Sequence, residues 1–323
     1  MRQSHIYIGV MTNLKQQTHV SRIYDTFDRI ENTKKKMYRS SNRYTGPVTT
    51  LIGDWSGTFV DKGSLAPKHA VMQTFSSFGI SLTISEAGAP MGVRKDEHIR
   101  HIFNNLRIKN MWMSIYNRFP NDQDINTVYE KLVSIQLQIL YLEPLYSKVI
   151  PGTVKTINHI RNKYNIKVGL TTEFTKNMSD ILIKAVAKEG LFLDSVVAGD
   201  EVNNGSRPHP NMLYRNLTLL GTYDIQSVVK VDDTIAGIRE GLNAGCWTVG
   251  VRKWSTYTDY DSLYHLDNVS LEEIKRRSNI AGDILEKNGA HYVVDDVNNL
   301  PNVINDINRR LHHGDDPRLY KLE

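Results

Sequence analysis

The chain has 323 residues, of which 40% are hydrophobic and 23% charged. This composition is typical of globular proteins and excludes a largely disordered or fibrous chain. A single cysteine, Cys246, excludes an internal disulfide framework and a multi-cysteine metal site. The longest strongly apolar stretch, residues 133–142, contains polar side chains and is too short to cross a bilayer. We therefore expect a soluble, cytoplasmic protein with no membrane partner.

The positive charge of the chain lies at its N-terminus. The whole chain carries a formal charge of +5, whereas residues 1–44 contain nine Lys/Arg and three Asp/Glu, so the remainder is slightly acidic. We interpret residues 1–46 as a basic, flexible leader. Targeting to an organelle and weak binding of a polyanion are alternative roles for it. Since the charge does not extend into the rest of the chain, we do not expect a nucleic-acid partner.

The first elements after the leader are a strand and a group of helices. Residues 48–53 form an apolar, β-branched run that predicts a buried strand ending at Asp54. Apolar spacing farther along predicts helices over residues 69–78, 95–106 and 128–142. No clear strand interrupts them, so this region is expected to be an all-helical insert.

From Pro151 onward, strands and helices alternate. Helices are expected over residues 154–164, 176–189, 210–219 and 235–244, and strands over residues 166–171, 195–198, 227–231 and 246–251. This alternation predicts a parallel sheet with right-handed crossovers. The expected fold class is α/β. A Rossmann-like parallel sheet core comprises residues 47–66 and 151–323, and the all-helical insert comprises residues 67–150.

Polar residues stand at the ends of the predicted strands: Asp54, Thr171, Thr172, Asp232 and Asp233. Ligands of open parallel sheets bind outside the carboxyl ends of the strands. Two acids at neighbouring strand ends can share a divalent cation, and oxygen ligands with phosphate suit Mg²⁺. Arg207, in a loop before a helix, adds a guanidinium that can bind a phosphoryl group through two hydrogen bonds.

Several segments carry a resemblance that covers residues 48–308. They are Asp54-Trp-Ser-Gly-Thr58, Asp61-Lys-Gly-Ser-Leu-Ala-Pro67, Glu86-Ala-Gly-Ala-Pro-Met-Gly-Val-Arg-Lys95, Gly205-Ser-Arg-Pro-His-Pro210, Lys230-Val-Asp-Asp-Thr234 and Asn288-Gly-Ala-His291. In this order they resemble the haloacid dehalogenase superfamily of phosphotransfer enzymes, and most closely its phosphonoacetaldehyde hydrolase (phosphonatase) family. The stretch from Pro90 to Lys95 is the most specific. The resemblance implies the haloacid dehalogenase fold, with the helical insert as a cap.

The same resemblance implies a reaction. Phosphatases of this superfamily carry a second aspartate two residues after the nucleophile, where it protonates an oxygen leaving group, and this chain has Ser56 there. Breaking a carbon–phosphorus bond needs an electron sink instead, which a lysine imine supplies. The expected activity is hydrolysis of phosphonoacetaldehyde to acetaldehyde and phosphate, through a Lys95 imine and an Asp54 aspartyl phosphate.

The roles of the remaining residues are implied by the resemblance as well. Mg²⁺ would be held by Asp54, the Ser56 carbonyl and Asp233, with Asp232 beside them. Phosphate and substrate would be bound by Gly57, Thr58, Met91, Gly92, Thr172 and Arg207. His98 lies three residues after Lys95 on a predicted helix, which places both on one face, and is the expected proton shuttle.

The resemblance further implies a homodimer formed through the caps. The helical face with Met111, Trp112 and Ile115 would contribute to the dimer interface. Alternatively, this face is buried within the cap itself.

The sequence departs from the family pattern near the expected site. Asp232-Asp233 stands where the family has Gly-Asp, and Gly237 where a further aspartate is usual. Asp232 is therefore expected to replace the missing charge. Glu173-Phe174 replaces Gly-Tyr, and a carboxylate turned toward the phosphate would repel it. Ser64 replaces a frequent cysteine.

Two other functions remain open from the sequence. One is phosphatase activity on a small phosphate monoester, with Lys95 only gripping the substrate. The other is a non-catalytic relative that binds a polyanion through its leader.

Overall fold

The structure, a computed structural model, describes residues 43–203 and 205–319. The chain divides into two units, residues 1–44 and 45–323, and the description that follows concerns the second. The prediction of a flexible leader falls on residues 1–46, of which 1–42 lie outside the described residues.

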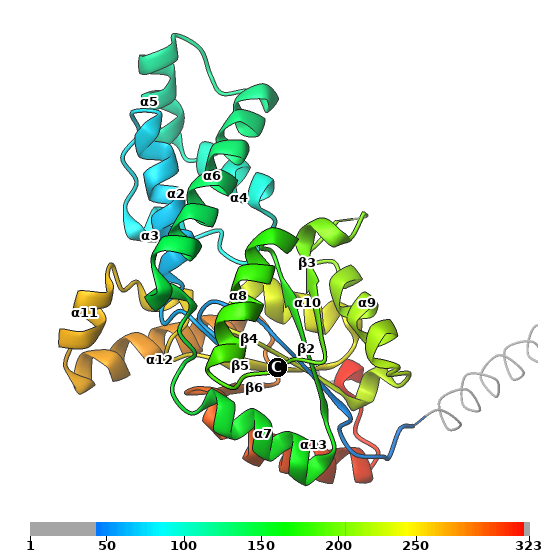
Figure 1. Cartoon of the computed structure of the whole chain (residues 1–323). Helices are drawn as coiled ribbons and strands as arrows, with labels where there is room; N and C mark the ends of the chain where they lie inside the picture. The colour runs from blue at the N-terminus through cyan, green and yellow to red at the C-terminus, as the bar shows by residue number, and fades with distance from the viewer. Residues whose placement is uncertain (1–42, 204, 320–323) are drawn as a thin grey trace, which may run out of the picture. The chain divides into compact units, whose positions relative to one another are not determined.

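A parallel sheet forms the core of this unit (Figure 1). Its strands are β1 (Thr50–Gly53), β2 (Lys167–Thr172), β3 (Ser195–Ala198), β4 (Val228–Asp232), β5 (Trp247–Val251) and β6 (Tyr292–Val294). They lie in the order β3-β2-β1-β4-β5-β6, and every neighbouring pair is parallel. The predicted parallel sheet is thus confirmed. Because β1 is flanked by β2 and β4, the residues after these three strands meet at one edge.

The strands are apolar because helices cover the sheet. These helices are α7 (Thr153–Tyr164), α8 (Lys176–Lys188), α9 (Asn211–Leu220), α10 (Ile235–Ala244), α12 (Leu271–Lys287) and α13 (Leu300–His312). The short α11 (Leu263–Asn268) packs through Leu266 against Leu65 and Tyr260 instead. Helix α9 packs on β2 and β3, α10 on β4 and β5, and α12 on β5 and β6. All residues of β1, β4 and β5 are buried.

The helices between β1 and α7 form a separate group beside the sheet (Figure 1). They are α2 (Leu65–Ser77), α3 (Ile84–Gly88), α4 (Lys95–Phe103), α5 (Leu106–Tyr116) and α6 (Asp122–Leu142). The long α6 packs against α2 and α4, and its lower end contacts α8 of the core. Thr83 and Asn121 begin α3 and α6 with capping boxes, in which side chain and backbone satisfy each other's hydrogen bonds. The predicted all-helical insert is therefore present.

One predicted helix ends earlier than expected. The helix expected over residues 95–106 ends at Phe103, and a second helix begins at Leu106, where the Asn105 side chain accepts a hydrogen bond from the Arg107 backbone. For Trp112 the sequence left open a dimer face or burial within the cap, and the structure has the second: Trp112 is 2% exposed and packs against the rings of Phe103 and Tyr116. Ile115 on the same helix is 45% exposed.

Strand β6 and helices α11–α13 lie beyond the last predicted strand, in a region for which no elements were predicted. None of the described helices is long and apolar enough to cross a membrane.

Candidate active site

Three aspartates meet at the carboxyl edge of the sheet. Asp54 follows the central strand β1, while Asp232 and Asp233 end and follow β4. One carboxylate oxygen of each lies within 4.8 Å of the others, and all three residues are buried. The predicted convergence of the strand ends therefore occurs.

Arg207 connects the aspartates to β2. Its Nη2 donates to Asp54 Oδ1 over 2.8 Å and to the Thr171 carbonyl over 2.6 Å. The same nitrogen lies 3.3 Å from Asp232 Oδ2, and the side chain is 1% exposed. Burial alone would lower the pKa of this guanidinium, but the surrounding carboxylates raise it well above its ordinary value. Arg207 therefore stays charged and holds Asp54 in place.

Two further residues complete this group, and the sequence analysis assigned neither a role. Lys230 Nζ lies 3.0 Å from Asp232 Oδ2 and 3.2 Å from Glu240 Oε2, and both side chains are fully buried. Glu240 Oε2 also accepts from Arg207 Nε over 3.0 Å. The sequence did contain a sign of these contacts, namely a lysine in the middle of the apolar strand β4. A lysine buried there needs anionic partners. We refer to Asp54, Thr171, Arg207, Lys230, Asp232, Asp233 and Glu240 as the strand-end cluster.

Asp233 is held by the loops around it. Its Oδ1 accepts from Thr58 Oγ1 over 3.1 Å, and its Oδ2 from the Thr256 backbone N–H over 2.8 Å. Gly57 has a φ of 78°, and a Cβ there would lie 2.3 Å from Asp233 Oδ2. Only glycine fits this close approach. Thr58 and Gly57, both expected to bind phosphate, thus support Asp233.

The departures at positions 232 and 237 are sterically linked. A Cβ at Gly237 would lie 1.9 Å from Asp232 Cγ, so the Asp232 carboxyl group occupies the space that a side chain at position 237 would need. Asp232 Oδ1 also accepts a hydrogen bond from Thr234 Oγ1 over 2.8 Å. This overlap is consistent with the expectation that Asp232 replaces a charge usually supplied from position 237.

The strand-end cluster contains more negative than positive groups, since four carboxylates face the two cations Arg207 and Lys230. Arg207 and Lys230 lower the pKa of Asp232, although burial opposes them. Burial raises the pKa of Asp54 to about 6 against the effect of Arg207. Burial and the charges of Asp232 and Asp54 raise the pKa of Asp233 well above its ordinary value. A cation would relieve this repulsion, so the residues fit a metal ion.

A small cavity of about 30 Å³ joins the cluster to the helical insert. We call it the inner cavity; it is lined by Asp54, Ser56, Ser64, Met91, Gly92, Lys95, Thr172, Glu173, Phe174, Arg207 and Thr234. Gly92, with a φ of 94°, lets the loop before α4 approach the core, because a Cβ there would lie 2.4 Å from Thr234 Oγ1. This close approach places Lys95 in the lining of the same cavity as Asp54.

Lys95 is the first residue of α4 and is 3% exposed. Its Nζ lies 5.2 Å from the centre of the Phe174 ring and forms no hydrogen bond or ion pair with any described residue. Burial lowers the pKa of Lys95 to about 8, although the charges of Glu173 and Asp54 oppose this shift. An amine with this pKa is partly uncharged near neutral pH, which makes it nucleophilic.

His98 does not line the inner cavity. It is fully buried in α4 and its Nε2 lies 3.0 Å from the Ala87 carbonyl oxygen. Burial lowers the pKa of His98 to about 3, and the charge of Lys95 adds to this effect. Lys95 and His98 share one helix but differ in their access to the cavity.

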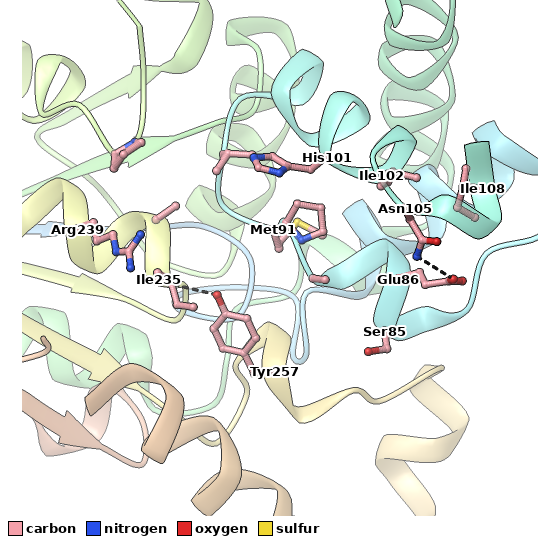
Figure 2. A pocket seen from close by; sticks show the side chains of 15 residues that line it. Ser85, Glu86, Met91, His101, Ile102, Asn105, Ile108, Ile235, Arg239 and Tyr257 are labelled. Atoms are coloured by element: carbon pink, nitrogen blue, oxygen red, sulfur yellow. Dashed lines mark hydrogen bonds between the residues drawn. The ribbon is translucent and has the colours of Figure 1, made fainter. Parts of the chain in front are cut away.

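Figure 2 shows a larger cavity, of about 670 Å³, that shares Met91 with the inner cavity. Residues of α3 and α4, including His101, line it on one side, and Arg239 and Tyr257 line it on the other. Neither Asp54 nor Lys95 belongs to its lining. The titratable groups that converge on one point are in the inner cavity, so the candidate active site lies there.

The comparisons with known proteins agree with this geometry. Residues 52–251 match the haloacid dehalogenase-like hydrolase family. The parallel sheet, the acids at its strand ends and the helical insert define a hydrolase of this superfamily.

The relatives narrow the assignment. The chain is 35% identical to phosphonoacetaldehyde hydrolase from Syntrophobacter fumaroxidans, over 85% of this chain and 97% of the relative. It is 38% identical to phosphonoacetaldehyde hydrolase from Paraburkholderia xenovorans, over 84% and 99%. The crystal structure of a phosphonoacetaldehyde hydrolase like protein from Oleispira antarctica matches with a TM-score of 0.81 and 38% identity, over 86% of this chain and 98% of that one. The chain belongs to the phosphonoacetaldehyde hydrolase family.

Proposed function

We propose that the chain hydrolyses the carbon–phosphorus bond of phosphonoacetaldehyde to acetaldehyde and phosphate. The observation that carries this proposal is the uncommitted amine of Lys95 in the same cavity as Asp54. An aldehyde bound to Lys95 there would have its phosphonate group toward Asp54 and Arg207. The names of the relatives support the same substrate.

The proposed reaction proceeds in three stages. Lys95 Nζ condenses with the aldehyde carbon and water leaves, so that an iminium ion forms. A carboxylate oxygen of Asp54 then attacks phosphorus, and the electrons of the breaking carbon–phosphorus bond move into the iminium to give an enamine. The enamine takes a proton on carbon and is hydrolysed to acetaldehyde and Lys95, while water hydrolyses the aspartyl phosphate of Asp54.

The strand-end cluster would hold the charges of this reaction. Asp54, Asp233 and the Ser56 carbonyl are the groups proposed to hold Mg²⁺, with Asp232 adding charge from behind. A bound Mg²⁺ would neutralise phosphonate oxygens during the attack. Thr172 and Arg207 line the cavity and are proposed to contact the same oxygens.

The inner cavity has room for about two water molecules, which is less than the substrate needs. We propose that residues 67–150 form a cap, and that residues 47–66 and 151–323 form the core. The cap would move away from the core to admit the substrate and close again to exclude water.

We also propose a homodimer through the cap. Exposed Ile115 is a candidate contact, so Ile115→Glu is expected to shift the protein toward monomer in sedimentation.

The decisive experiment measures acetaldehyde and phosphate released from phosphonoacetaldehyde with Mg²⁺. The parent protein is expected to release both in equal amounts, and to lose activity on borohydride reduction in the presence of substrate, with the adduct on Lys95. Lys95→Arg keeps the charge but cannot form the imine, and is the matched control. Release by this variant would contradict the mechanism. Phosphate release from monoesters with no trapped imine would favour a phosphatase instead.

A further inference from the structure

Glu173 is the charged residue of the inner cavity to which the proposed reaction assigns no role. It follows Thr172 directly after β2 and is 7% exposed. Its Oε1 accepts a hydrogen bond of 2.7 Å from the Arg207 backbone N–H. Its Oε2 is buried and has no hydrogen-bond partner among the residues the structure describes. One oxygen therefore anchors the carboxyl group while the other is left available.

Gly199 provides the space for this available oxygen. A Cβ at position 199 would lie 2.9 Å from Glu173 Oε2 and 3.4 Å from Glu173 Cα, closer than such atoms pack without displacement. The carboxyl group is thus confined between the Arg207 backbone on one side and Gly199 on the other. This arrangement accommodates a glutamate where the family pattern has glycine.

Glu173 and Lys95 both line a second cavity, of about 270 Å³. We call it the outer cavity; Arg94, Asn126, Tyr129 and Asp200 also belong to its lining. The two residues therefore form part of the wall between the inner and outer cavities. A residue that moves protons during catalysis must reach both the reacting atoms and water. Glu173 borders both cavities, which places it between the proposed reacting atoms and the outer cavity, whereas His98 lines neither cavity.

We propose that Glu173 is a further catalytic residue, which carries protons from Lys95 Nζ to the carbonyl oxygen of the aldehyde during imine formation. This inference rests on the proposed function, because it requires an imine at Lys95. Its carboxylate takes one proton from the Lys95 ammonium, and the amine attacks the carbonyl carbon. The carboxylic acid then protonates the carbonyl oxygen.

A second proton follows the same route from nitrogen to oxygen, the carbon–oxygen bond breaks, and water leaves as the carbon–nitrogen double bond forms. Ammonium and aldehyde thereby become iminium and water, and Glu173 ends as it began. The reverse sequence returns Lys95 when acetaldehyde is released. No other reactant is needed.

The surroundings of Glu173 suit exchange of a proton near neutral pH. Burial raises the pKa of Glu173 to about 7, and the charge of Glu240 adds to the increase. Arg207 and the Ser206 hydroxyl oppose it. The Glu173 charge opposes the lowering of the Lys95 pKa by burial and adds to the raised pKa of Arg94.

Glu173→Gln tests this proposal, because it keeps the size of the side chain and an acceptor for the Arg207 N–H but does not titrate. Imine formation is followed directly, by the rate at which borohydride traps acetaldehyde on Lys95. We expect this rate and kcat to fall about 10²-fold or more in the variant, with little change in KM. The part of the acid limb of the kcat–pH profile that titrates near pH 7 is expected to disappear, while the contributions of Asp54 and Lys95 remain.

Three controls separate this effect from damage to the site. Mg²⁺ binding measured by calorimetry is expected to be retained in Glu173→Gln, which would leave the strand-end cluster intact. Asp200→Asn removes a carboxylate that lines the outer cavity but not the inner one. Its kcat–pH profile is expected to have the same acid limb as that of the parent protein. Glu173→Gly opens space that acetate or formate can enter, and added carboxylate is expected to restore part of its rate.

Several outcomes would overturn the proposal. Trapping at the parental rate with an unchanged acid limb in Glu173→Gln would reduce Glu173 to a structural residue. Faster turnover in Glu173→Gly would identify it as a charge that repels the phosphonate. If the parent itself neither traps acetaldehyde nor releases it from phosphonoacetaldehyde, the proposed function fails and this inference fails with it.

Discussion

On the sheet side of the inner cavity, Arg207 and Lys230 each contact more than one carboxylate. On the cap side, Lys95 Nζ faces the ring of Phe174 and forms no hydrogen bond or ion pair with a described residue. Both sides are buried, so burial does not explain the difference. The multiple contacts of the sheet side restrict its side chains, as the proposed binding of a phosphoryl group requires. The cap side holds an amine that has no paired carboxylate in the described part of the chain and whose pKa is lowered by burial, which favours its reaction with an aldehyde.

The first test asks whether substitutions on the two sides of the cavity affect different activities. Asp54→Asn removes the nucleophile of the sheet side and is expected to abolish both carbon–phosphorus cleavage and the slow hydrolysis of an activated aryl phosphate, by about 10⁴-fold or more. Lys95→Ala is expected to abolish only the first. Each activity is measured by phosphate release. Equal loss of both activities in Lys95→Ala would show that the lysine holds the phosphoryl group rather than the aldehyde.

A second test disturbs the packing of the sheet side. Gly237→Ala would place a Cβ 1.9 Å from Asp232 Cγ, which forces apart a buried ion pair. The expected loss in free energy of unfolding is about 3 kcal/mol or more, measured by urea denaturation. The double variant Asp232→Gly/Gly237→Asp restores the family pattern, and it is expected to be more stable than Gly237→Asp alone. Additive effects of the two substitutions would contradict the steric link.

The third test measures the ionisation of the cap-side lysine. Since burial lowers its pKa to about 8, Lys95 is protonated below that pH and neutral above it, whereas an ordinary lysine stays protonated to about pH 10.4. Competitive labelling with an amine-reactive reagent, followed by peptide mass analysis, is expected to give a midpoint near pH 8 for Lys95. A midpoint for Lys95 at about pH 10.4, as for an ordinary lysine, would contradict the effect of burial.

The smallest effect is expected at the periphery of the strand-end cluster. Thr58→Val removes the hydroxyl that donates to Asp233 over 3.1 Å, at a cost in unfolding free energy of about 1–2 kcal/mol. Ser64→Ala removes a longer contact of 3.4 Å to the same carboxylate and is expected to cost less. Thermal denaturation of the two variants measures the difference. The opposite order would place the stronger support of Asp233 at Ser64.

The fold was largely predictable from local patterns, because apolar runs and helical spacing are visible over a few residues. The alternation after Pro151 predicted the parallel sheet, and the acids after its strands predicted the edge where the candidate site lies. The end of α4 at Phe103 was missed by three residues, because the single capping side chain of Asn105 sets the start of α5. The short, half-buried strand β6 has too few residues to give a clear alternation.

The sequence by itself determined which chemical groups this protein brings to its site: the acids after β1 and β4, Arg207, and the lysine of the most specific segment. Only the tertiary structure decided which of them meet. It joined Lys230 and Glu240 to the strand-end cluster, separated His98 from the cavity, and placed Glu173 in the lining of the same two cavities as Lys95. Residue identity is local, whereas burial, distance and the pKa values that follow from them depend on segments that lie far apart in the chain.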